Sequence, residues 1–221
     1  MSNVANCFGY VPERTNGVCI ILKEPGGNNN EENSPQLNQK GNGNWYIDKV
    51  CSNEHIDRTV SIYRERFMDL LEALKIGSRD IENLKRCYYT NICYDRQGTT
   101  VDSNEGYGKL SGTCKAKRFD IIKNAFIEAT SDFSGERVIF LIDDTFKELK
   151  EYYREQGVNL DINNGLVYTV KQDPDGKQDT DGNQDTDGDQ YDEFFDASNN
   201  IRVMAIHHPI RAKSEVHYIR R

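Results

Sequence analysis

Three polar residues of different chemistry end or interrupt apolar runs of the sequence: Glu24, Asn91 and His208. A carboxylate can hold or deprotonate a water molecule, and a neutral imidazole can donate a hydrogen bond to a group on which negative charge develops. A carboxamide both donates and accepts hydrogen bonds. If these side chains converge at one edge of the fold, the sequence predicts a site there rather than an ordinary polar surface.

Each residue also has an ordinary structural explanation. Glu24 can be a strand-end carboxylate that faces water, and Asn91 can be a buried amide whose hydrogen bonds serve only the fold. His207 precedes His208 on the same run, so we expect one of the two to point into the core and only one to be functional. Trp45, the single tryptophan of the chain, can simply fill the core.

Four runs that are apolar through their middle are predicted to be strands buried on both faces of a parallel sheet. They cover residues 17–24, 87–94, 137–144 and 201–208, and residues 165–170 are a candidate for an extra edge strand.

Helical periodicity separates these runs and predicts helices within residues 55–77, 115–129 and 145–157. Thr145 and Glu148 have the spacing of a capping box at the start of the third helix. Asp143 and Asp144, just before it, are expected to cap this helix rather than to catalyse.

Strands that alternate with helices are typical of an α/β protein. The expected fold is a three-layer α/β/α sandwich around a central, mostly parallel four-stranded sheet, and residues 1–221 are expected to form a single domain. Residues 26–44 and 173–196 are too polar to enter a core and are predicted to be loop insertions. Ligands of such sheets bind beyond the carboxyl ends of the strands, where the three polar residues lie.

The charge of the chain is concentrated in one of these loops. Residues 173–196 hold ten acidic residues and one lysine, a charge of −9, so the chain's total of −8 leaves +1 for the rest. From Arg202 onward the sequence has five lysines and arginines and one acidic residue, Glu215. This distribution is compatible with a polyanionic partner without requiring one.

The acidic loop also repeats the unit D-x-D-G with a period of six. Aligned to a calcium-binding EF-hand loop, it places Phe194 where the bidentate glutamate belongs. The favoured interpretation is therefore a self-repelling loop, and weak divalent-cation binding at residues 173–189 is the less favoured one. No metal site is expected.

The six cysteines form no C-x-x-C pair, and no apolar stretch reaches the length of a membrane span. Buried free thiols are expected at Cys19 and Cys87. These observations, together with the absence of a signal peptide at the start of the sequence, predict an intracellular protein of the reduced cytoplasm or nucleus that does not enter a membrane.

Four motifs occur in the order found in the uracil-DNA glycosylase superfamily, and the chain resembles a divergent member of it. The motifs are IILKEPGG after the first strand, YYTNICY, VIFLIDDTF, and VMAIHHPIRAK at the last strand. Together they span about residues 17–215. The chain departs from the best-known members because Lys23-Glu24 stands before the proline where they keep an aspartate, and because Pro209 is not followed by Ser-Pro.

The resemblance implies a role for each motif. Glu24 would orient or deprotonate water, and His208 would stabilise the departing base. Asn91 would read the base, and Trp45 or Tyr46 would stack on it. The implied DNA contacts are Pro25, Gly26, Gly27, Pro209, Ile210, Arg211 and Lys213, with Ile210 or Arg211 as the residue that wedges into the duplex. No cofactor is implied, since the four spaced cysteines of iron–sulfur branches are missing.

The expected function is that of a DNA glycosylase-like hydrolase in DNA repair, which flips a deaminated or modified pyrimidine and cleaves its N-glycosidic bond. The expected partner is single- or double-stranded DNA with a modified base, and the expected state is a monomer. The alternative is a catalytically inert member of the same fold that binds nucleic acid or protein. A nucleotide-binding α/β protein is a third interpretation, disfavoured because no phosphate-binding glycine motif is present.

Overall fold

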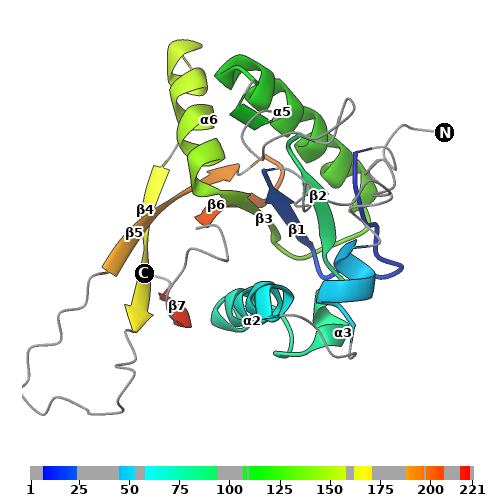
Figure 1. The fold of residues 1–221 in the computed structure, drawn as a ribbon. Coiled ribbons are helices and arrows are strands. Elements are labelled where there is room, and N and C mark those ends of the chain that lie inside the picture. Colours follow the sequence, from blue (N-terminus) through cyan, green and yellow to red (C-terminus); the bar gives the residue numbers. More distant parts are fainter. Residues whose placement is uncertain are drawn as a thin grey trace, which may run out of the picture.

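The computed structural model describes residues 7–23, 45–52, 58–93, 107–108, 110–157, 162–170, 188–196, 198–206 and 215–219, and only the backbone of 162–170, 188–192 and 215–219. These residues form a mixed sheet with helices on both faces (Figure 1). The predicted α/β class and its three layers are confirmed.

The four predicted strands form one half of the sheet, and all of them run parallel. Their order is β2 (Tyr88–Asn91), β1 (Val18–Leu22), β3 (Arg137–Ile142) and β6 (Ile201–Ile206). Every residue of β1, β2 and β6 is buried. Burial on both faces explains why β1 is a continuous apolar run and why β3 and β6 each contain a single arginine among apolar residues.

The sheet is larger than the four strands predicted, because three antiparallel strands extend it beyond β6. They are β5 (Gly188–Asp196), β4 (Ile162–Val170) and β7 (Glu215–Ile219), in that order. The candidate strand at 165–170 is part of β4, but β4 is not the expected edge strand, because β7 pairs with its outer side. Residues 173–196 were predicted to be a loop throughout, but their last part is β5, which pairs with β4 and β6 on its two sides.

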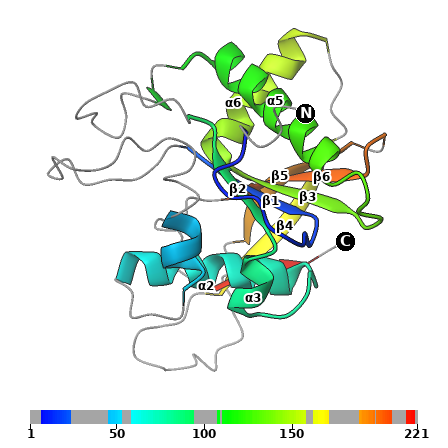
Figure 2. The same cartoon turned by 90° about the vertical axis from the view of Figure 1, so that its right-hand side faces the viewer.

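Helices cover both faces of the sheet (Figure 2). Helices α5 (Gly112–Ala129) and α6 (Asp143–Glu155) lie on one face, and α2 (Arg58–Ala73) and α3 (Ile81–Leu84) lie on the other. A short π-helix, η2 (Tyr46–Val50), packs against α2. The buried residues of α2 recur at helical spacing, as predicted.

Gly17 sets the entry of the chain into β1. Its φ angle is +77°, and a Cβ atom here would lie 2.2 Å from the Phe133 ring, so no other residue fits without displacing that ring. The Gly17 carbonyl accepts a hydrogen bond of 2.9 Å from the Val138 amide. The register of β1 against β3 therefore begins at this glycine.

All six cysteines are free, and five of them are buried, including Cys19 and Cys87 as predicted. Burial raises the pKa of the Cys87 thiol to about 12, and burial likewise raises that of Cys51 to about 12. Among the described helices, none combines the length and the apolar character that a membrane crossing requires.

These thiols predict a loss of stability in alkali. Below pH 9 the Cys51 and Cys87 thiols are protonated in both the folded and the unfolded chain, so they contribute no pH dependence. Between pH 9 and 12 the unfolded chain loses these protons while the folded protein keeps them, and the free energy of unfolding falls by about 1.4 kcal/mol per pH unit for each thiol. Urea unfolding at pH 8, 9.5 and 10.5 measures this slope.

Cys87→Ala is expected to make the slope shallower, whereas Cys114→Ala, at a half-buried position on α5, is the matched control. An unchanged slope in Cys87→Ala would contradict the assignment.

Candidate functional site

The order of the parallel strands creates a topological switch point at their carboxyl ends. From β1 the chain crosses to β2 on one side by way of α2, and from β2 it crosses to β3 on the other side by way of α5. The connections diverge where β1 and β3 are neighbours, and ligands of doubly wound sheets bind at such a switch point. The residues at this edge are Lys23 after β1, Asn91 at the end of β2, and Asp143 and Asp144 after β3.

Asn91 is the most unusual side chain at this edge. It is 1% exposed and lies opposite Leu22 of β1. Neither its amide nitrogen nor its amide oxygen has a hydrogen-bond partner among the described residues. The Asn91 side chain lies close enough to the Tyr89 phenol to lower its pKa, against the larger rise that burial causes, but the two groups do not form a hydrogen bond of normal length and angle. A buried amide without partners costs about 1–3 kcal/mol, so its presence at this position calls for an explanation.

The direction of Asn91 follows from the alternation of side chains along β2. Tyr88 contacts Phe126 of α5, with ring centroids 5.3 Å apart. Tyr89 faces the opposite layer, where it stacks on Tyr46 with centroids 4.6 Å apart. Asn91 is two residues beyond Tyr89 and therefore lies on the same face, toward η2 and α2.

The two predicted stacking residues lie on this same face but differ in exposure. Tyr46 is completely buried, and its hydroxyl donates a hydrogen bond of 2.9 Å to the Leu84 carbonyl. Trp45 is only half-buried; its ring meets Tyr63 edge-on at 5.4 Å and lies 6.0 Å from Tyr89. Tyr46 is thus a core residue, and Trp45 is the aromatic residue of the pair that keeps exposed surface.

The remaining predicted site residues lie outside the described part of the chain. They are Glu24, Pro25, Gly26, Gly27, His208, Pro209, Ile210, Arg211 and Lys213. The segment 173–189, with the less favoured cation site, also lies outside it except for the first residues of β5.

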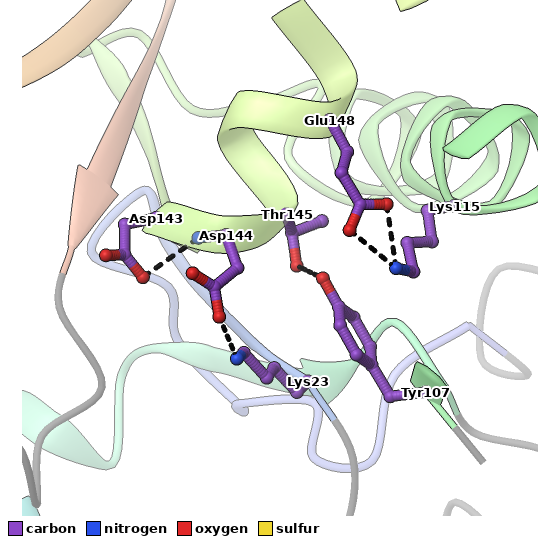
Figure 3. A network of polar contacts seen from close by, with 7 residues as sticks. All are labelled: Lys23, Tyr107, Lys115, Asp143, Asp144, Thr145 and Glu148. Carbon is purple, nitrogen blue, oxygen red and sulfur yellow. Dashed lines mark hydrogen bonds and ion pairs between the residues drawn. The ribbon is translucent and has the colours of Figure 1, made fainter. Parts of the chain in front are cut away.

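The structure adds a polar network at this edge that the sequence did not predict (Figure 3). Lys23 forms an ion pair with Asp144, and the Lys23 ammonium lies 5.3 Å from the centre of the Tyr107 ring. The Lys115 ammonium lies 4.0 Å from the same ring, within the range of a cation–π interaction. The Tyr107 hydroxyl shares a hydrogen bond of 2.6 Å with the Thr145 hydroxyl.

This network corrects the prediction of a capping box at the start of α6. The helix begins at Asp143, two residues before the predicted cap, and its N-cap residue, Ile142, makes no side-chain capping bond. Thr145 instead bonds to Tyr107, and Glu148 forms an ion pair of 2.7 Å with Lys115.

The two aspartates belong to the first turn of α6, where the helix dipole favours negative charge. Asp143 accepts a hydrogen bond of 2.8 Å from the Asp144 amide. Asp144, however, directs its carboxylate toward Lys23 at the end of β1. The prediction that these aspartates cap the helix is therefore wrong: both lie inside α6, and Asp144 forms a long-range contact instead.

Electrostatics keep Tyr107 a neutral phenol. Burial raises its pKa, as do the carboxylates Glu148, Asp144 and Asp143, while the hydrogen bond with Thr145 opposes them. Lys115 is almost completely buried, and its ammonium is neutralised by Glu148. Within the described residues, both ammonium groups beside the ring thus have a carboxylate partner.

Comparison with known proteins adds no relative: no family model, no curated protein and no solved structure matches this chain. The class that the structure itself defines is an α/β protein with a buried carboxamide at the carboxyl edge of its parallel strands.

Proposed function

We propose that this protein is a DNA glycosylase-like hydrolase that flips a deaminated or modified pyrimidine out of DNA and cleaves its N-glycosidic bond. The observation that supports it best is Asn91, a buried carboxamide at the carboxyl edge with no partner among the described residues. An amide that can both donate and accept matches the Watson–Crick edge of a pyrimidine. The base would supply the hydrogen bonds that the described residues do not.

In the proposed reaction, Glu24 orients a water molecule and accepts its proton as the oxygen bonds to C1′ of the sugar. The bond between C1′ and the base nitrogen breaks, and its electron pair leaves with the base. His208 donates a hydrogen bond to the oxygen on which this negative charge develops. Trp45, which is only half-buried and lies on the same face as Asn91, is the proposed stacking residue.

The proposed contacts with the DNA backbone come from the chain segments that follow β1 and β6. Pro25, Gly26 and Gly27 would approach the backbone after β1. Pro209, Ile210, Arg211 and Lys213 would do so after β6, with Arg211 and Lys213 neutralising phosphates. The protein is proposed to act as a monomer.

The test is a panel of single- and double-stranded oligonucleotides that carry uracil or other modified pyrimidines. After incubation with the protein, alkali cleaves the strand wherever a base has been released, and denaturing gels count the products. Scission at one modified base, absent from an unmodified strand, is the expected result. No scission across the whole panel would remove the enzymatic proposal.

A catalytically inert member of the same fold is the second candidate. Lys23-Glu24 in place of an aspartate and the altered residues after Pro209 favour it. Such a protein would bind the same oligonucleotides without cleaving them. Fluorescence anisotropy measured at several salt concentrations distinguishes the two, because phosphate contacts make binding weaker as salt rises.

A further inference from the structure

The end of β1 is held by two backbone hydrogen bonds to the segment that carries Asn91. The Leu22 carbonyl accepts a bond of 2.9 Å from the Ile92 amide, and the Lys23 carbonyl accepts one of 2.8 Å from the Cys93 amide. Whatever fixes Lys23 therefore also fixes Asn91 relative to the point where the chain leaves β1.

Lys23 is fixed from the other side by α6. Its side chain is 22% exposed and forms the ion pair with Asp144 in the first turn of that helix. The pair thus joins β1 to the helix that follows β3, across the switch point of the sheet (Figure 3).

Tyr107 completes the connection. Its ring is buried, lies beside the Lys23 and Lys115 ammonium groups, and is attached by its hydroxyl to Thr145. Lys115 belongs to α5 and pairs with Glu148 of α6. The Tyr107 ring therefore packs against two ammonium groups, and the carboxylate partner of each comes from α6. These contacts leave little freedom of movement for any of the side chains.

We propose that Lys23, Asp144 and Tyr107 form a positioning clamp, which holds the carboxyl end of β1 at a fixed place beside Asn91. Glu24 is the next residue in the chain, so the clamp sets where the water-activating carboxylate begins relative to the base-reading amide. This inference rests on the proposed function for the roles of Glu24 and Asn91. Misplacing a reacting group by about 1 Å can cost on the order of a hundredfold in rate, which gives such a clamp a measurable effect.

The test compares Asp144→Asn and Tyr107→Phe with the wild type. Glu136→Gln is the matched control, since it breaks an ion pair of 2.8 Å with Arg202 at the opposite, amino end of the strands. Far-UV circular dichroism and thermal unfolding identify the variants that fold. The double variant Lys23→Asp/Asp144→Lys restores an ion pair with the charges exchanged.

The first measurement needs no catalytic activity. Hydrogen–deuterium exchange at the Cys93 amide reports whether the Lys23 carbonyl stays in place. We expect Asp144→Asn to exchange at least about tenfold faster there, Glu136→Gln to exchange at the wild-type rate, and the exchanged pair to recover part of the protection. Unchanged exchange in Asp144→Asn would overturn the clamp.

The second measurement uses an oligonucleotide that the wild type cleaves. The clamp predicts a kcat lowered about tenfold or more in Asp144→Asn with KM unchanged, and partial rescue by the exchanged pair. An altered KM at constant kcat would instead make Lys23 a ligand for a substrate phosphate and overturn the positioning role. If the wild type cleaves nothing, the proposed function fails, while the exchange at Cys93 still decides whether the clamp exists.

Discussion

Asn91→Leu is expected to unfold at a higher temperature than the wild type. The substitution replaces a buried amide, which has no partner among the described residues, with an apolar side chain of similar size. Removing the unmet hydrogen-bonding groups should stabilise the free protein by about 1–3 kcal/mol. For a chain of this length each kcal/mol corresponds to about 2–4 °C in Tm, which differential scanning calorimetry resolves readily.

Asn83 provides the matched control, because it is an equally buried asparagine whose amide is fully used. Its nitrogen donates to the Ile76 and Ser78 carbonyls at 2.5 and 2.9 Å, and its oxygen accepts from Asn16 at 3.0 Å. Asn83→Leu should therefore lower Tm. If Asn91→Leu also lowers it, the Asn91 amide is satisfied within the folded protein, and its role is structural.

The same stabilised variant should fail in function. A two-point contact with a base edge contributes about 1–3 kcal/mol, so Asn91→Leu should cleave the preferred oligonucleotide about tenfold to a hundredfold more slowly. Gain of stability together with loss of activity in one variant is typical of a residue retained for ligand binding. If the variant is more stable but cleaves at the wild-type rate, Asn91 does not take part in recognising the base.

Glu24→Gln is expected to abolish most of the proposed activity. Glutamine keeps the size of the side chain but cannot accept a proton from water, and general base catalysis contributes about a hundredfold to ten-thousandfold to a rate. Single-turnover cleavage of the oligonucleotide identified in the panel measures this loss directly. Binding of the same oligonucleotide, followed by fluorescence anisotropy, should change little, since the reaction step rather than association is affected.

Glu136→Gln is again the suitable control, because it removes one carboxylate from the far end of the sheet. A Glu24→Gln protein that cleaves at the wild-type rate would transfer the water-activating role to another residue or support the inert alternative. A protein that loses both binding and cleavage would place Glu24 in DNA contact rather than in the reaction step.

The parallel half of the sheet could be predicted because burial on both faces produces a distinctive sequence. Val18–Leu22 contains no charged or amide residue and Ile201–Ile206 only Arg202, as burial on both faces of a central strand requires. The alternation with helices then placed the candidate site at one edge. Asn91 was identified by the same signal, as the polar residue that interrupts such a run, and the structure shows it buried at that edge.

Strand β5 was not predicted because most of its residues have a low propensity for extended structure. Asp189, Asp192, Glu193 and Asp196 disfavour extended pairing, and the acidic repeat before them indicates a loop. Pairing with two neighbouring strands overrides this propensity. The available signal was Phe194, which is buried against Phe146 of α6 with ring centroids 5.8 Å apart.

The polar network around Tyr107 could not be predicted for a different reason. Lys23 and Asp144 are far apart in the chain, and nothing in the local pattern of either selects the other as its partner. Thr145 and Glu148 did carry a local pattern, the capping box, but both side chains form tertiary contacts instead. Local spacing competes with contacts that only the folded sheet creates.

The position of β1 has a consequence for how the chain folds while it is being synthesised. The first strand of the described residues, β1, lies between β2 and β3, and Val18 pairs with Val138. A ribosome adds about 5–20 residues per second, so this apolar segment waits on the order of ten seconds before its second neighbour exists. During that interval its exposed edge can pair with other chains, and slowing translation between residues 91 and 137 should increase the fraction of newly made protein that aggregates.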